Sequence, residues 1–510
     1  MLGRAFHLAN ECIPIVDLGL RYDPEGKPLI EDCAKQDFMQ MYTAPEVASA
    51  FSSLYTNQDG LLDKMWDFWT VVATHFANDP NVIGYDILNE PWAANLYHES
   101  SLFFQPESFD RDILFPITQA AHTTIRAVDD THIIFFEPSQ FPDTLPFAGG
   151  VTLNVGFPET PGGTDYLNRQ ALNDHSYCCQ ASADICANGE PPIDKKEFCY
   201  DFAMQKASKR AENAATFGVP LIFTEFGACY DGMECYNEIS STADACDSVM
   251  ASWLYWQYKS YGDWTTTGGA AEGMFNEDGT PQAIKVKAIT RTYMQRYQGT
   301  PLTTYFSTND GGYATTWTIN ANITEPSKFY TNTGDWYPNG YKWVTYHPKN
   351  GKAIEGTSIW TDPSNHTNQL SFFDERPYDG KDIGLLVTPR LTQTSGSFPS
   401  EDGEYTMFWE YVDEGFTGVC TINVEYSANM LSWVEAYLVN RQNVALNIFG
   451  RTFRSNSHSV VCGDLLDAEV KLISKSHSWT TYSETLLSLP LTGANGHTIN
   501  ISIEYTGSNT

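Results

Sequence analysis

The stretch Val82-Ile-Gly-Tyr-Asp-Ile-Leu-Asn-Glu-Pro-Trp92 decides how the rest of the chain is interpreted. It begins as an apolar run typical of a buried strand, and it ends where Asn89 and Glu90 stand side by side before Pro91. Because proline cannot donate a hydrogen bond to a sheet, we expect Glu90 at the carboxyl end of this strand. A single glutamate in such a place is more often an exposed surface acid than a functional one.

A second apolar run, Pro220-Leu-Ile-Phe-Thr-Glu-Phe-Gly-Ala228, ends in the same way at Glu225, followed by a glycine where the chain leaves the sheet. Two acids at the ends of two parallel strands are the arrangement that a glycosidase needs. Cleavage of a glycosidic bond requires one protonated carboxyl at the leaving oxygen and, in retaining enzymes, one carboxylate that attacks the anomeric carbon. We assign Glu90 as the acid/base and Glu225 as the nucleophile.

The composition excludes several other classes of protein. Hydrophobic residues make up 42% of the 510 residues, which excludes a disordered chain. No run approaches the roughly 20 apolar residues of a membrane span, so no transmembrane segment is predicted. With 63 acidic against 30 basic residues the formal net charge is -33. This charge repels nucleic acid and anionic lipid surfaces, so we expect no nucleic-acid partner.

The cysteines and glycosylation triplets indicate an oxidising compartment. Eleven cysteines lie at irregular spacings that match no zinc pattern, so disulfides are expected and no metal site is. In the C-terminal part Cys420 and Cys462 are candidates to pair with each other. Acceptor triplets begin at Asn322, Asn365 and Asn500. We therefore expect a secreted, lysosomal or endomembrane-lumen glycoprotein, although no signal peptide is visible in this chain.

Helix and strand patterns alternate between residues 61 and 297. The expected helices are 61–76, 113–128, 202–217, 243–250 and 284–297, and the expected strands are 82–90, 132–137, 170–177, 220–225 and 253–258. This order predicts an α/β fold, a parallel (β/α)8 barrel of TIM type whose site lies at the carboxyl ends of its strands. Because only five strands are found, we expect that the barrel domain, residues 1–298, lacks its first three βα units.

The pattern changes after about residue 300. Stretches such as 405–411, 418–425 and 498–504 alternate apolar with polar residues, and turn residues separate them at short intervals. Residues 299–510 are therefore predicted to form a C-terminal antiparallel β-sandwich.

Four further residues are candidates for binding substrate. Asn89 is expected to donate to the sugar 2-hydroxyl, and Tyr177 to hydrogen-bond Glu225 and hold it ionised. His175 is expected to tune the proton balance of the site, and Trp256 to form a floor on which a sugar ring stacks. From the sequence, Trp256 is equally well a core residue, and His175 equally well a structural one.

Four stretches of this chain resemble the motif set of glycoside hydrolase family five, which belongs to the larger clan of retaining barrel glycosidases. These are Asn89-Glu-Pro-Trp92, His175-Ser-Tyr177, Thr224-Glu-Phe-Gly227 and Trp256. More narrowly, residues 84–92, 225–228 and 256–259 together with a trailing sandwich resemble the endoglycoceramidases. That resemblance implies a retaining endo-β-glycosidase that cuts glycan from ceramide in glycosphingolipids, with no cofactor. It also implies a glycolipid or oligosaccharide substrate, and leaves a lipid-presenting activator open as a partner.

Two family residues have no counterpart that we can identify. The family takes an arginine from its second strand and a histidine from its third, and neither can be placed within residues 1–60. The alternatives within the family are a steryl or ceramide β-glucosidase and an endo-β-1,4-glucanase. The alternatives of another class are an inactive glycolipid-binding relic and a purely structural glycoprotein.

Overall fold

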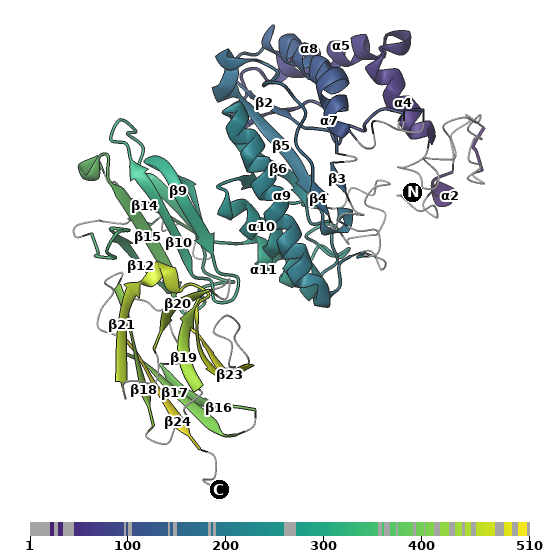
Figure 1. Ribbon diagram of the computed structural model, residues 1–510. Coiled ribbons are helices and arrows are strands. Elements are labelled where there is room, and N and C mark those ends of the chain that lie inside the picture. The colour runs from purple at the N-terminus through teal and green to yellow at the C-terminus, as the bar shows by residue number, and fades with distance from the viewer. Residues whose placement is uncertain are drawn as a thin grey trace. The chain divides into compact units, whose positions relative to one another are not determined.

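The computed structural model (Figure 1) describes most of the chain beyond residue 44 and two short segments before it. The described residues are 21–24, 29–33, 45–95, 98–99, 102, 105–140, 143–145, 150–181, 185–186, 190–259, 272–354, 360–361, 368–373, 376–390, 394–401, 403–412, 419–427, 434–440, 444–449, 455–474, 484–491 and 498–506. The predicted glycosylation site at Asn365 lies outside them. The chain divides into two units, Met1–Ile289 and Thr290–Thr510.

The first unit alternates helices with strands. Its helices are α2 (Ile30–Cys33), α4 (Pro45–Tyr55), α5 (Leu61–Phe76), α7 (Pro106–Phe109), α8 (Phe115–Arg126), α9 (Lys196–Phe217), α10 (Met233–Ser248) and α11 (Ala283–Ile289). Its strands are β1 (Gly84–Asp86), β2 (Ile133–Phe136), β3 (Thr144–Leu145), β4 (Val151–Thr152), β5 (Gln170–Ser176), β6 (Leu221–Phe226) and β7 (Ser252–Trp253). The predicted α/β alternation is confirmed.

Five of these strands form one parallel sheet in the order β1-β2-β5-β6-β7. Helices α5 and α8 cover its first strands, since Ala73 and Ile125 pack with Tyr85 and Ile134 in one apolar cluster. Helix α9 contacts β5 and β6 and runs beside α10 (Figure 1). The sheet thus brings the carboxyl ends of the predicted strands to one edge.

The sheet is strongly curved. In a flat sheet β1 and β6 would lie about 14 Å apart, because three strand spacings of about 4.8 Å separate them. Yet the side-chain nitrogen of Asn173 on β5 donates both to Asp86 Oδ2 on β1, at 3.0 Å, and to Thr224 Oγ1 on β6, at 2.9 Å. This curvature agrees with the predicted barrel. That the first three βα units are missing stays a prediction.

Local sequence explains where two of the helices run. Helix α5 has the predicted bounds, and its apolar residues at helical spacing face the sheet, where Ala73 is fully buried. Helix α9 ends at Gly218, which adopts a left-handed conformation with φ +71° and donates its N–H to the carbonyl of Ala214. Pro220 follows and starts the extended chain that leads into β6.

Three predicted boundaries are wrong. Helix α10 begins at Met233 rather than at residue 243, so the cysteine-rich loop is shorter than expected. The predicted strand 253–258 is regular only in β7, and Trp256 adds a single bridge to Gly227. The helix predicted over 284–297 ends at Ile289. Residues 293–296 instead form β8, because they pair with β11 of the second unit.

The second unit consists of strands in four sheets. The strands are β8 (Tyr293–Arg296), β9 (Gly299–Phe306), β10 (Tyr313–Ile319), β11 (Ser327–Asn332), β12 (Tyr341–Tyr346), β13 (Trp360–Thr361), β14 (Asn368–Phe373), β15 (Asp382–Pro389), β16 (Ser395–Pro399), β17 (Tyr405–Val412), β18 (Val419–Tyr426), β19 (Val434–Val439), β20 (Ala445–Ile448), β21 (Ser455–Val461), β22 (Glu469–Ser474), β23 (Glu484–Pro490) and β24 (Thr498–Tyr505). The sheet orders are β12-β15-β10-β9, β13-β14-β11-β8, β16-β17-β24-β18-β21 and β20-β19-β22-β23.

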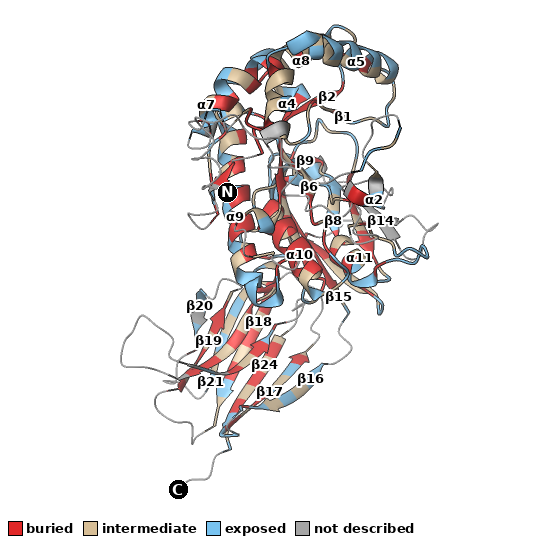
Figure 2. Ribbon diagram, turned by 90° about the vertical axis from the view of Figure 1, so that its right-hand side faces the viewer, coloured by how far each residue is buried: buried red, intermediate tan, exposed pale blue. Residues whose placement is uncertain are grey.

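These sheets confirm the predicted C-terminal antiparallel architecture, with one exception. Strands β18 and β24 pair in parallel, whereas the other described ladders of the unit are antiparallel. Buried positions alternate along β17, β18 and β24 with positions that are mostly of intermediate exposure, as Figure 2 shows. Cys420 and Cys462 form a disulfide inside the apolar core between the sheets. Among the described helices, none has the length and apolar character to span a membrane.

Candidate active site

Glu90 follows β1 at the edge where the parallel strands end. Its backbone is in the left-handed region, with φ 45°, a conformation that costs free energy for any residue other than glycine. The Glu90 N–H donates to Oε2 of the buried Glu137, which follows β2, at 3.1 Å. This bond holds the unusual backbone in place and so fixes the direction of the Glu90 side chain.

Glu225 lies on β6, one residue before the strand ends at Phe226. The chain then turns at Gly227, where φ is +100° and a Cβ atom would lie 2.1 Å from the ring of Tyr255. Only glycine fits this turn, because a side chain would be both strained and blocked. The turn therefore fixes the end of β6, and with it the place of Glu225.

The structure brings Glu90 and Glu225 together around His175. Carboxylate oxygens of the two acids and a ring nitrogen of His175 all lie within 4.8 Å of one another. Nδ1 of His175 lies 2.9 Å from Glu90 Oε1 and 3.6 Å from Glu225 Oε2. The His175 side chain is 1% exposed, against 21% for Glu90 and 14% for Glu225. The two acids thus face a shared, partly open space over a buried histidine.

Tyr177 lies directly after β5 and donates its hydroxyl to Glu225 Oε1 at 2.6 Å. The predicted contact between these two residues is therefore present in the structure. A hydrogen bond to a carboxylate stabilises the ionised form and lowers its pKa.

His175 carries positive charge at neutral pH. Burial by itself lowers the pKa of His175. The carboxyls of Glu137, Glu90 and Glu225 outweigh this effect and raise the pKa to about 10. Burial also raises the pKa of Glu137 well above its usual range, and the charge of His175 opposes that rise.

The pKa of Glu225 is the result of opposing effects. Burial raises it, and the nearby charge of Glu90 adds to the rise. The positive charge of His175 and the hydrogen bond from Tyr177 both lower it. By raising the pKa of Glu225, burial favours its neutral form, whereas a nucleophile must be ionised to attack. His175 and Tyr177 are therefore the residues that make ionised Glu225 accessible.

The two other predicted residues lie at the rim of the site. Asn89 is exposed and directly precedes Glu90. Trp256 is half-buried, and its indole Nε1 donates to Glu272 Oε2 at 3.2 Å. The backbone bridge between Trp256 and Gly227 holds this ring beside the turn that follows Glu225. The positions suit contact with substrate, and the roles of both residues stay predictions.

Sequence reasoning missed Glu137 as a member of the site. It is fully buried, and its Oε1 lies 3.9 Å from Nε2 of His175. Within the described residues this oxygen accepts no hydrogen bond. The signal was visible, because Glu137 ends the apolar strand 132–137 in the same way as Glu90 and Glu225 end theirs.

Four buried charges lie behind His175, and no sequence pattern indicated them. Asp174 accepts the backbone N–H of the histidine at 2.7 Å and is bonded by Arg210 Nε from α9. One turn before Arg210, Lys206 donates to Asp143 Oδ2 at 2.7 Å, and Arg210 also contacts that oxygen at 3.3 Å. The four side chains are at most 5% exposed. They hold β5, and thus His175, against α9.

Glu90, His175 and Glu225 are also close enough to offer ligand atoms to one cation. The ring nitrogen Nδ1 of His175, which faces both acids, lies 2.9 Å from Glu90 Oε1, a hydrogen-bond distance. A proton shared among the acids and His175 is the arrangement that the geometry favours.

This chain is similar to one family of known proteins. Residues 42–262 match the model of the family described as cellulase, glycosyl hydrolase family 5. An endoglycoceramidase of Cyanea nozakii is 32% identical over 354 residues, which are 68% of this chain and 63% of that protein. An endoglycoceramidase of Hydra vulgaris is 30% identical over 326 residues, 63% of this chain and 56% of that protein. The chain thus spans less than two thirds of the length of these relatives.

A solved structure supports the fold. The endo-glycoceramidase II from Rhodococcus sp. in its ganglioside GM3 complex superposes with a TM-score of 0.53, covering 73% of this chain and 72% of that chain. The sequence identity is 21%, so this likeness concerns the fold alone.

Proposed function

We propose, because residues 42–262 match the family model of glycosyl hydrolase family 5, that this protein is a retaining β-glycosidase. One observation supports the proposal most strongly. The carboxylate oxygens of Glu90 and Glu225 approach within 4.8 Å, close to the separation of about 5 Å at which one carboxylate attacks the sugar directly. Acids that leave room for a water between them lie farther apart, at about 6.5–9.5 Å.

In the proposed mechanism Glu225 attacks the anomeric carbon while Glu90 gives a proton to the leaving oxygen. The bond from C1 to the leaving oxygen breaks as the bond from C1 to the Glu225 carboxylate forms. Glu90, now ionised, then removes a proton from a water molecule, and this water releases the sugar from Glu225 with its original configuration. Positive His175 contacts both acids and compensates the negative charge that passes between them.

The assignment of roles rests on Tyr177. Its hydroxyl donates to Glu225 and stabilises the ionised form, as a nucleophile requires, whereas Glu90 has the more exposed side chain, open to the leaving group and to water. A mechanism-based 2-fluoro glycoside should leave a covalent label on Glu225, detectable in its peptide by mass spectrometry. A label on Glu90 would reverse the two roles.

We propose glycosphingolipid as the substrate, with cleavage between the glycan and ceramide. The support comes from two relatives at 30% and 32% identity that bear the name endoglycoceramidase. Full-length protein incubated with a fluorescent ganglioside should release the intact glycan and an equal amount of ceramide. Release of terminal monosaccharides alone would contradict this endo cleavage. The anomer formed first, followed by NMR, reports retention.

A second function, endo-β-1,4-glucanase, is favoured by the family description, which is cellulase. Cellotetraose discriminates between the two, because a glucanase cleaves it at a rate comparable to its best substrate and a glycolipid hydrolase does not.

A further inference from the structure

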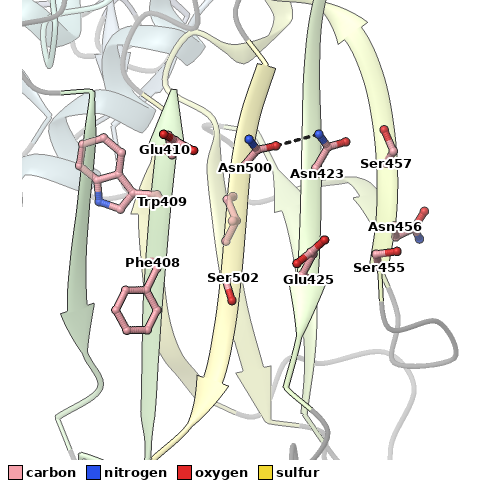
Figure 3. Close-up of a pocket in the computed structure, with 11 residues that line it drawn as sticks. Phe408, Trp409, Glu410, Asn423, Glu425, Ser455, Asn456, Ser457, Asn500 and Ser502 are labelled. Carbon is pink, nitrogen blue, oxygen red and sulfur yellow. Dashed lines mark hydrogen bonds between the residues drawn. The ribbon is translucent and has the colours of Figure 1, made fainter. Parts of the chain in front are cut away.

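The outer face of the sheet β16-β17-β24-β18-β21 has a hollow of about 890 Å³ (Figure 3). It lies in the second unit, and this inference does not depend on the proposed glycosidase activity. The hollow is centred on strand β24, which pairs with β17 on one side and with β18 on the other. Among the residues that the structure describes, its lining includes amide, hydroxyl, carboxylate and aromatic side chains, and no lysine or arginine.

Strand register arranges the polar lining in two rows that run across the strands. In the first row Asn500 lies opposite Glu410 and beside Asn423, which lies opposite Ser457. Four strands at a spacing of about 4.8 Å make this row about 14 Å long, the length of two or three sugar rings. Figure 3 shows these side chains in line, with Asn423 facing Asn500.

The second row lies two residues further along each strand. Phe408 lies opposite Ser502, which is beside Glu425, and Glu425 lies opposite Ser455. Phe408 is 39% exposed, an uncovered aromatic ring on an otherwise polar face. Such a ring offers a flat apolar surface to the C–H face of a sugar, while the neighbouring serine and carboxylate can bond sugar hydroxyls.

The charge of the hollow selects a neutral occupant. Within the described part of the lining, the charged residues are Glu410 and Glu425, which would repel phosphate, sulfate and sialic acid. The two carboxylates come from strands separated by β24 and from different rows, which puts their Cα atoms about 12 Å apart. They are too distant to hold one cation between them. Neutral sugar is the ligand class that fits the hydroxyls, amides and aromatic ring.

The sequence contains an acceptor triplet for such a sugar at the centre of the hollow. Asn500-Ile-Ser502 is an acceptor triplet for N-glycosylation, and both of its polar side chains point to this face because they lie two residues apart on a strand. Asn423 Nδ2 donates to Asn500 Oδ1 at 2.9 Å. The bond therefore uses the carbonyl oxygen of Asn500, and its Nδ2 is not the donor.

We propose that Asn500 carries an N-linked glycan whose first sugars lie in this hollow and pack against Phe408. Nδ2 of Asn500 would displace the diphosphate group from C1 of the first N-acetylglucosamine of a lipid-linked oligosaccharide. The N–C1 bond forms, the C1–O bond breaks, and the amide loses one proton to base. The hydrogen bond from Asn423 survives, because the modified amide keeps its oxygen free to accept.

The triplet at Asn322 provides an internal comparison. Asn322 is exposed in the turn between β10 and β11, and it does not line the hollow. A glycan at Asn322 would extend into solvent, so it should be trimmed quickly by an endoglycosidase. The glycan at Asn500 should be trimmed more slowly, because the hollow covers its first sugars.

The test uses the chain secreted from a eukaryotic host behind a supplied leader. Mass spectrometry should find Asn500 occupied in the intact protein and unoccupied in Ser502→Ala, which leaves the asparagine and its bond to Asn423 in place. Ser502→Thr keeps the triplet and should restore occupancy. An unoccupied Asn500 in the intact protein overturns the proposal. Binding of an added neutral tetrasaccharide such as cellotetraose to the hollow would not restore it, because the proposal requires a glycan attached to Asn500.

Packing against Phe408 is tested by a double-mutant cycle. In the glycosylated protein Phe408→Ala should lower the Tm by about 2 to 4 °C, a typical shift for losing one such contact in a unit of this size. In the Ser502→Ala background the same change should have a much smaller effect. Thr324→Ala, which removes the Asn322 triplet, is the control and should not alter the effect of Phe408→Ala.

If the effects of Phe408→Ala and Ser502→Ala on the Tm are additive, the proposal that the glycan packs against Phe408 in the hollow is overturned. Trimming rates give an independent measurement should a variant unfold too readily. Phe408→Ala should speed trimming at Asn500 several-fold and leave trimming at Asn322 unchanged. Equal rates at the two sites in the unaltered protein would also overturn the proposal.

Discussion

Tyr177→Phe should move the acid limb of the pH profile to higher pH. The change removes the 2.6 Å hydrogen bond to Glu225 Oε1 and keeps the ring. This bond lowers the pKa of Glu225, so its loss raises that pKa, and less of the nucleophile is ionised at a given acidic pH. A hydrogen bond to a charged group contributes about 1.5 to 3 kcal/mol, and one pKa unit is about 1.4 kcal/mol. The expected shift is therefore about 1 to 2 units.

The measurement is kcat/KM for a fluorescent glycosphingolipid across the acidic range, because this ratio reports ionisations of the free enzyme. Tyr85→Phe is the matched control. It removes another 2.6 Å bond from a buried tyrosine hydroxyl to a carboxylate, that of Asp129, away from the two acids. This control should lower stability and leave the acid limb in place. An acid limb that stays unchanged in Tyr177→Phe would refute the role given to the bond.

Three further outcomes are expected. Glu225→Gln should lower kcat at least about 100-fold while circular dichroism shows an unchanged fold, since the nucleophile alone is lost; activity above a hundredth of the unaltered enzyme would reject the assignment. Glu137→Gln should lower the pKa of His175, because Glu137 raises it, and activity should therefore begin to fall at a lower alkaline pH; an unmoved alkaline limb contradicts this. Cys420→Ser opens the link to Cys462 across 42 residues and should cost the second unit about 4 kcal/mol of unfolding free energy, measured by urea denaturation; a loss below about 1 kcal/mol would count against it.

The sequence predicts those parts of the fold that depend on local patterns. The periodicity of residues 61–76 gives α5 with its observed bounds, and apolar runs locate the five parallel strands. The same runs locate Glu90 and Glu225 near the carboxyl ends of their strands, although β1 ends at Asp86, four residues before Glu90, rather than at Glu90 as predicted. The closeness of the two acids requires curvature of the sheet, which is accompanied by contacts between residues far apart in sequence, such as those of Asn173 with Asp86 and with Thr224.

The misses have physical reasons as well. Lys206 and Arg210 look like ordinary helix surface, since charges on a helix are usually solvated, and only the fold brings Asp143 and Asp174 to them. The sequence predicts a helix at 293–296, where the structure has a strand. The strand forms because pairing with a partner more than 30 residues further on outweighs the local preference for helix. In both cases the deciding contact is distant in sequence.

The buried charges behind His175 have a consequence for how such proteins can diverge. Asp143 and Asp174 are the counterions of Lys206 and Arg210, so the formal charges of these four residues sum to zero. Replacing one of them leaves an ion without a counterpart in a dry setting, which typically costs 3 to 5 kcal/mol, a large part of what keeps a domain folded. In related proteins we therefore expect an acid and its basic partner at these positions to be replaced together or both kept. In a gene copy released from selection, a substitution at one of these four residues would unfold the protein as readily as a substitution of Glu90 would remove the proposed activity.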